Sequence, residues 1–202
     1  MSDTTAEAKD DMNGRRKFLV AATSAMGAVG AVGVATPFIG SWNPSAKAKA
    51  AGAPVRVDVS KVREGEQIRA EWRGKPVFVM RRTADNLGSL DTTDALVADP
   101  QSEVPQQPTY VDGKTRSIKP EIFITVGICT HLGCSPQFRP EVAPADLGGD
   151  WVGGYFCPCH GSRFDLAGRV YKAVPAPSNM VVPPHRYETD NIVVIGEDEV
   201  SA

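Results

Sequence analysis

The most restrictive feature of this sequence is that all four cysteines lie between residues 129 and 159, in two short boxes. The first box reads Cys-Thr-His-Leu-Gly-Cys from residue 129, and the second reads Cys-Pro-Cys-His-Gly-Ser from residue 157. Cysteines that brace a whole domain through disulfides would be expected to be spread along the chain. The bunching therefore predicts a local site.

Each box offers one thiolate, one imidazole and a second cysteine. The four candidate ligands are Cys129, His131, Cys157 and His160. One hypothesis is a tetrahedral zinc ion in a binding module without redox activity. Zinc boxes rarely use Cys-x-His spacing, however, and zinc would leave the second cysteine of each box unexplained. One cysteine and one histidine per box better match a two-iron cluster in which one iron keeps two cysteines and the other takes two histidines.

The segment resembles the Rieske iron–sulfur family, whose signature is Cys-x-His-x-Gly-Cys together with Cys-x-x-His. The resemblance implies one [2Fe–2S] cluster, with Cys129 and Cys157 on one iron and the two histidines on the other. It also implies that Cys134 and Cys159 form a disulfide that braces the two cluster loops. Ser162 matches the serine that donates a hydrogen bond to a bridging sulfide.

A long uncharged stretch follows three cationic residues near the N-terminus. Arg15, Arg16 and Lys17 precede the 23 positions 18–40, none of which carries a charge. A helix of that length spans about 34 Å, enough for a hydrocarbon core of about 30 Å. The arginine pair resembles a twin-arginine export signal. By the positive-inside rule, residues 1–14 are then a disordered cytoplasmic tail, and the bulk of the chain lies on the periplasmic side of the inner membrane.

Two properties of this segment leave alternatives open. Its length favours a retained single-pass anchor over residues 15–40, since a cleaved signal has an apolar region of only about 7–15 residues. Cleavage within the small-residue run 46–50 is the alternative. Gly27, Gly30 and Gly33 suit either a mildly hydrophobic export signal or a face that packs against other transmembrane helices.

Residues 41–54 lack large apolar side chains apart from a tryptophan and are expected to be a flexible linker with a reach of about 20 Å. A helix in the alanine-rich part of this linker is the alternative. Beyond it, apolar alternation and short apolar runs predict strands. They are expected at 55–59, 68–72, 77–80, 121–128, 153–156, 180–182 and 192–195, with a hairpin turn at 73–76. Residues 83–108 are polar, with at most a short helix at 93–97.

These patterns predict a mainly β chain: one N-terminal transmembrane helix, a linker and an antiparallel β domain over residues 55–202. The 19 glycines and 16 prolines suit turn-rich β structure. A formal net charge of −2 gives no indication of a nucleic-acid partner. The resemblance further implies a β-sandwich with a small cluster-binding subdomain at about residues 127–178.

The whole layout is similar to the Rieske subunit of the cytochrome bc1 complex, a quinol–cytochrome c oxidoreductase. Neutral imidazoles make such a cluster less negative, so that it accepts an electron more readily. The resemblance implies that His160 meets a membrane quinol and takes a proton while the cluster takes an electron. Leu132, Gly133 and Pro175 would lie at the docking tip. A disulfide suits the oxidising compartment outside the inner membrane.

The same resemblance implies cytochrome b and cytochrome c1 as partners in a dimeric complex, with the tethered head moving between them. The sequence shows no quinone pocket and no Cys-x-x-Cys-His haem motif, so the active site is not complete in this chain alone. The alternative function is the Rieske subunit of another exported oxidoreductase, such as the small subunit of arsenite oxidase.

Two positions depart from the family pattern. Val174 stands where members usually carry glycine, at the start of residues 174–179, which resemble the proline loop that covers the cluster. Phe164 stands where many members have a tyrosine that donates to a cysteine sulfur, so we expect a lower reduction potential. Outside both boxes, His185 follows two prolines and is expected to be an ordinary loop histidine.

Overall fold

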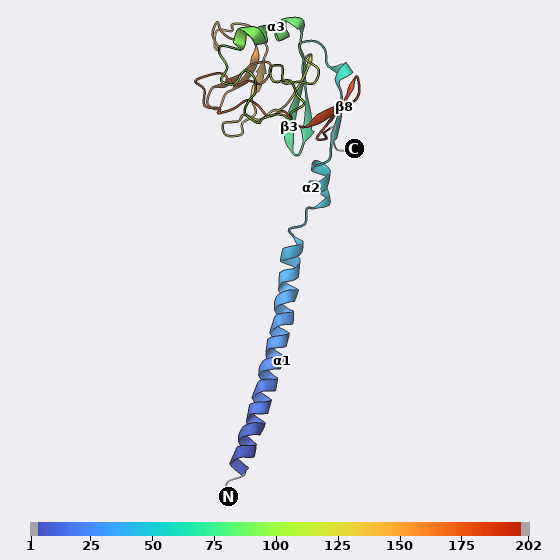
Figure 1. Cartoon of the computed structure of the whole chain (residues 1–202), viewed down its shortest axis with the longest axis vertical. Helices are drawn as coiled ribbons and strands as arrows, with labels where there is room; N and C mark the ends of the chain where they lie inside the picture. Colours follow the sequence, from blue (N-terminus) through green and yellow to red (C-terminus); the bar gives the residue numbers. More distant parts are fainter. Residues whose placement is uncertain (1–3, 199–202) are drawn as a thin grey trace. The chain divides into compact units, whose positions relative to one another are not determined.

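The long N-terminal helix belongs to the first of two units in the chain. The computed structural model describes residues 4–198, with one unit that ends at Lys49 and a second that begins at Ala50. Figure 1 shows the elements coloured along the chain. Helix α1 (Thr4–Gly40) contains Gly14–Gly40, a segment long and apolar enough to cross a bilayer. Its length and composition suit a membrane anchor, and they are also those of a signal sequence.

Helix α1 starts earlier than the sequence predicts. A disordered tail is expected over residues 1–14, but the helix begins at Thr4, and residues 1–3 lie outside the described part of the chain. The segment after Thr4 contains Ala6, Glu7, Ala8 and Lys9, which have high helix propensity. Extending an existing helix costs much less than nucleating a new one. The polar segment therefore continues the apolar helix.

The linker contains a short helix, the second of the two conformations that its sequence allows. Helix α2 (Ala46–Ala51) consists of alanine and lysine, which both favour helix. The Ser45 side chain accepts a hydrogen bond from the Ala48 N–H at 3.1 Å and so caps the first turn. The residues on either side of α2 have no regular structure up to β1.

The second unit contains three antiparallel sheets of three strands each. The first has the order β1 (Val55–Asp58), β9 (Ile192–Ile195), β8 (His185–Thr189); the second β2 (Gln67–Trp72), β3 (Lys75–Arg81), β4 (Ile122–Val126); the third β5 (Gln137–Arg139), β6 (Gly154–Cys157), β7 (Ser162–Phe164). A 3₁₀ turn, η1 (Val59–Lys61), follows β1, and helix α3 (Ala84–Thr93) follows β3. The prediction of a mainly β chain with an antiparallel β domain is confirmed.

Strand β3 is buried on both faces and takes part in two cores. Val77 and Val79 belong to the core between the first and second sheets, whereas Phe78 and Met80 belong to the core that includes β6 and β7. On that second side, the Phe78 ring stacks against Tyr155 of β6 with centroids 5.7 Å apart. This double burial explains the unbroken apolar run of β3, because neither face of the strand meets water.

Several predicted elements differ from the observed ones. No strand forms at 180–182: the Met180 N–H bonds to the Gly168 carbonyl and the Val182 N–H to Gln106, so these residues pair with loops. Strands β5 and β7 are too short for a repeating apolar pattern and were not predicted. Helix α3 ends where a short helix at 93–97 was expected to begin. The predicted position is wrong because the start of α3 is set by a reciprocal cap between Thr83 and Asn86.

His185 is not a loop residue. It is the first residue of β8, it is buried, and its Nδ1 lies 2.9 Å from the Pro183 carbonyl oxygen. Burial lowers its pKa from the ordinary value of 6.5, while the Pro183 carbonyl and the Asp198 carboxylate act in the opposite direction. The prediction was wrong because the two prolines before His185 are typical of a loop, whereas the short strand β8 begins directly after them.

Candidate metal centre

The two boxes form loops at the ends of strands. The first box follows β4, and the second lies in the turn between β6 and β7. Each loop is closed by a backbone hydrogen bond, from the Gly133 N–H to the Cys129 carbonyl and from the Gly161 N–H to the Cys157 carbonyl. Both glycines have a positive φ, 86° and 78°, which residues with a Cβ rarely adopt. The glycine in each box thus permits the tight turn that brings its side chains together.

The structure places the two thiols and the two imidazoles in different surroundings. Cys129 and Cys157 are free cysteines, each with only 2% of its surface exposed. His131 is half-buried and His160 is exposed, and their rings meet edge to face with centroids 4.8 Å apart. The site therefore has a buried sulfur side and a nitrogen side that reaches solvent.

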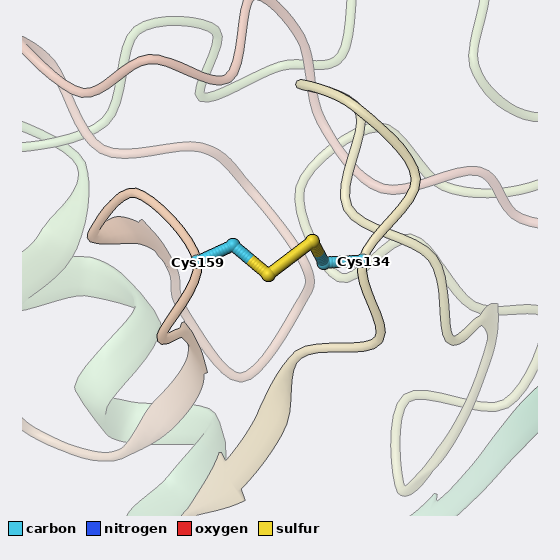
Figure 2. The surroundings of a disulfide bond; sticks show 2 residues. All are labelled: Cys134 and Cys159. Atoms are coloured by element: carbon cyan, nitrogen blue, oxygen red, sulfur yellow. A yellow bond between two sulfur atoms is a disulfide. The ribbon is translucent and has the colours of Figure 1, made fainter.

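The remaining two cysteines join the loops. Figure 2 shows the disulfide between Cys134 of the first box and Cys159 of the second, with a Cα–Cα distance of 6.8 Å. The sulfur of Cys157 lies within 4.8 Å of both disulfide sulfurs. Because Cys134 and Cys159 are oxidised, these three sulfurs are not a thiolate site, and the disulfide acts as the brace that the family resemblance implies.

The sulfur side fits a positively charged metal group. Burial raises the pKa of the Cys157 thiol, while backbone N–H groups of Cys159 and His160 act in the opposite direction and the neighbouring Cys129 thiol raises it further. A bound cation removes the protons of such thiols, since the thiolate is the metal ligand. Two adjacent thiols, of which Cys157 is met by backbone donors, together with two imidazoles are a donor set that suits iron.

Residues 174–179 contact both boxes. The Ala176 N–H donates to Ser162 Oγ at 3.1 Å, and Thr130 Oγ1 donates to the Ser178 carbonyl at 2.7 Å. Ser162 is buried, and because its oxygen accepts this bond, its own proton remains free for another acceptor. The positive φ near the start of this segment, 57°, falls on Ala173 and not on Val174, the position of the family's glycine.

A buried polar network behind the second box was missed from the sequence. Arg169 Nε lies 2.7 Å from Asp165 Oδ2, and both side chains are buried. Arg169 also donates to Asp94 Oδ1 at 2.7 Å and to the Leu90 carbonyl at 2.7 Å, which fastens the segment after β7 to the end of α3. The only indication of this network in the sequence was the pair of opposite charges at Asp165 and Arg169. Charged residues of this kind are more often found on a protein surface than in its interior.

The residues predicted for the docking tip are exposed. Leu132 has 72% of its surface accessible, and Gly133 and Pro175 are also exposed. Leu132 lies between the ligand candidate His131 and the glycine turn. The role of these three residues in docking stays a prediction.

The sequence of this unit matches the model of the Rieske [2Fe-2S] domain over residues 54–186. It is 59% identical over 188 residues to the ubiquinol-cytochrome c reductase iron-sulfur subunit of Allochromatium vinosum, covering 93% of this chain and 91% of that one. The chain belongs to the Rieske family of ubiquinol–cytochrome c reductase iron–sulfur subunits. Its cofactor is one Rieske-type [2Fe–2S] cluster.

Two further sequence comparisons agree with this family. Residues 5–45 match a model described as the ubiquitinol-cytochrome C reductase Fe-S subunit TAT signal, which supports the twin-arginine interpretation. The cytochrome b-c1 complex subunit Rieske of Aotus azarae is 36% identical, with 96% of this chain and 65% of that protein covered. A chain of a hyperthermophilic respiratory complex III has 25% identity and a TM-score of 0.47, with 84% of this chain and 95% of that chain covered. By their names, the two relatives are subunits of ubiquinol-cytochrome c reductase and of the cytochrome b-c1 complex.

Proposed function

We propose that the Rieske domain takes one electron and one proton from a membrane quinol and passes the electron to cytochrome c1 of the same complex. The observation that supports this most directly is the asymmetry of the site. The thiols of Cys129 and Cys157 are buried, whereas His160 is exposed and its ring lies against that of His131, the residue before the exposed Leu132. A ligand that can exchange a proton therefore lies at the surface where a quinol would dock.

In this proposal Cys129 and Cys157 bind one iron, and His131 and His160 bind the other. The bound cluster supplies a one-electron acceptor with two titratable ligands. The exposed imidazole of His160 accepts a hydrogen bond from the quinol hydroxyl and then its proton. The free hydroxyl proton of Ser162 would be donated to the bound cluster and would stabilise its reduced, more negative state.

The other residues of this end position the partners. Leu132, Gly133 and Pro175 form an apolar tip that docks against cytochrome b, where it shields the quinol from water. Helix α1 anchors the chain in the inner membrane with its N-terminus in the cytoplasm, and the Rieske domain lies on the periplasmic side. Residues 41–54 connect anchor and domain, and their length lets the domain alternate between cytochrome b and cytochrome c1 in a dimeric complex.

The test is His160→Ala in the full chain, expressed in membranes that contain the other subunits. We expect loss of the cluster's electron paramagnetic resonance signal and of quinol-dependent cytochrome c reduction, because one iron loses a ligand. The matched control is His185→Gln, which exchanges the one histidine outside the boxes and should retain both. Quinol-dependent reduction that persists in His160→Ala would refute the role of this residue.

A second test addresses the partners. Purification of the full chain from membranes under mild detergent should bring down a b-type and a c-type cytochrome in fixed ratio. A chain that purifies with another oxidoreductase, such as an arsenite oxidase, would contradict the proposed complex while leaving the cluster assignment intact.

A further inference from the structure

One side chain behind the cluster-covering loop joins three separate segments of the chain. Asn179 ends residues 174–179 and is fully buried. Its Oδ1 accepts a hydrogen bond from the Val170 N–H at 2.8 Å, and its Nδ2 donates to the Asp99 carbonyl and to Ser102 Oγ, both at 3.0 Å. Groups of the protein thus serve as hydrogen-bond partners for both the oxygen and the nitrogen of the Asn179 amide.

The segment that Asn179 grips is one for which the sequence suggested no role. Residues 93–106 run beside residues 165–182, and backbone hydrogen bonds join Ala98 to Val170, Lys172 to Leu96 and Val182 to Gln106. The Arg169 side chain adds a bond to the Pro100 carbonyl. We call residues 93–106 the strap, because they hold the chain on both sides of the covering loop.

The strap does not supply either of the loop's bonds to the cluster boxes described above. Those bonds run from the Ala176 N–H to Ser162 Oγ and from Thr130 Oγ1 to the Ser178 carbonyl. Asn179 follows directly after Ser178 and lies three residues after Ala176. It therefore fixes the C-terminal end of the loop in the position from which Ala176 reaches the Ser162 hydroxyl.

We propose that Asn179 is a positioning residue for the cluster: by tying the covering loop to the strap, it holds the Ala176 N–H on Ser162 and thereby sets the reduction potential. The inference rests on the proposed role of Ser162 and is independent of the quinol reaction. It gives the strap a function, which is to keep the covering loop in register with the second box.

The direction of the effect follows from the chemistry of a hydroxyl. A serine oxygen that accepts a bond from a fixed N–H has one lone pair engaged, so its proton is directed elsewhere. When that N–H withdraws, the hydroxyl rotates freely and donates less effectively to the reduced, more negative cluster. Loosening the loop at Asn179 should therefore lower the potential, in the same direction as removal of the hydroxyl itself.

The experiment is a double-mutant cycle on the reduction potential, measured by redox titration of the cluster signal in membranes that contain the full chain. The variants are Asn179→Ala, Ser162→Ala and the combination of both. We expect Asn179→Ala to lower the potential by a part of the shift that Ser162→Ala causes. In the Ser162→Ala background, the same substitution should cause little or no further shift, because its effect passes through the missing hydroxyl.

Two further variants separate positioning from general loss of stability. Ser102→Ala removes only one partner of the Asn179 amide and should lower the potential by a smaller amount. If Asn179→Ala does not assemble into the complex, Ser102→Ala tests the proposal in its place. Thr189→Ala removes a side chain that accepts from the Ile192 N–H at 3.1 Å in the β8–β9 turn. It should lower the midpoint of thermal unfolding and leave the potential unchanged.

Two results would overturn the proposal. One is a shift in Asn179→Ala that is equally large with and without the Ser162 hydroxyl, which would indicate that the loop acts by another route. The other is an unchanged potential in both Asn179→Ala and Ser102→Ala. Because these titrations need the cluster and no quinol, they remain decisive even if the quinol reaction proves to be different.

Discussion

The sheet pair formed by β1-β9-β8 and β2-β3-β4 is held together by apolar side chains, whereas the cluster end of the domain adds a disulfide and polar bonds to its apolar core. We define the cluster end as the two boxes, strands β5 to β7 and residues 174–179. In the sheet pair, residues such as Val79, Ile124 and Ile195 are almost completely buried. In the cluster end, a disulfide and bonds to backbone atoms join segments that have little regular structure. The geometry of the cluster loops therefore depends on these links, and we expect substitutions in the sheet pair to change stability without changing the reduction potential.

The largest expected effect comes from the brace of the cluster end. Replacement of Cys134 and Cys159 together by serine removes a link between residues 25 positions apart. The chain-entropy estimate for a loop of that size is about 3.5 kcal/mol of unfolding free energy. Guanidinium unfolding of the oxidised wild type and the double variant would measure it. A variant that unfolds at the same denaturant concentration would show that the cluster end does not depend on its disulfide.

The counterpart in the sheet pair is Ile195→Ala. Ile195 is fully buried in the core between β9 and the second sheet. Truncation of a buried isoleucine to alanine costs about 3 kcal/mol. We expect this loss in denaturant unfolding together with an unchanged reduction potential, since Ile195 belongs to a different core from Cys129 and Cys157. A shifted potential in Ile195→Ala would show that the two regions are not separable.

The contribution of the sheet pair to the free energy of unfolding should depend on pH. The pKa of the buried His185 lies below the ordinary value of 6.5, so the unfolded chain binds a proton at this residue more readily than the folded one. Stability from this residue is complete above about pH 6.5 and is lost as the pH falls, with a slope of at most about 1.4 kcal/mol per pH unit. His185→Gln should flatten the slope of unfolding free energy against pH below 6.5. An identical slope in wild type and variant would exclude this residue as the cause.

The smallest effect concerns the cluster end again. Phe164 is fully buried in the core that contains both free cysteines, and it lacks the hydroxyl that many relatives have. Phe164→Tyr should add a hydrogen bond to a cysteine sulfur worth about 1 kcal/mol in the reduced state, which corresponds to about 40 mV. Redox titration should show a higher potential in the variant. An unchanged or lower value would mean that the hydroxyl does not reach the sulfur.

The difference between the two regions also explains what could be predicted from the sequence. The apolar runs of β3 and β4 and the last strand, β9, follow directly from burial, which the amino-acid pattern records. The position of α3 was wrong because a cap of two polar side chains, Thr83 and Asn86, leaves no apolar signal. Strands of three residues, such as β5 and β7, are too short for any periodicity.

Within the site, spacing identified the boxes, and the resemblance to a family supplied the pairing of cysteines. The bonds of Ser162 and Thr130 to the covering loop, and the bond of Asn179 to the Val170 N–H, were not predicted, since a hydrogen bond to a backbone atom of a distant segment requires the fold itself. The burial of Arg169 and Asp165 was missed for a similar reason: charge indicates exposure until a partner is known.

Strand β3 has a consequence for how the domain comes apart. Its alternate side chains are shared by two cores, so neither core can lose its packing without exposing one face of the same strand. The two regions that differ in chemistry are then one cooperative unit in unfolding. The amide protons of β3 should accordingly exchange with solvent only through global opening, and their exchange rates report the stability of the whole domain.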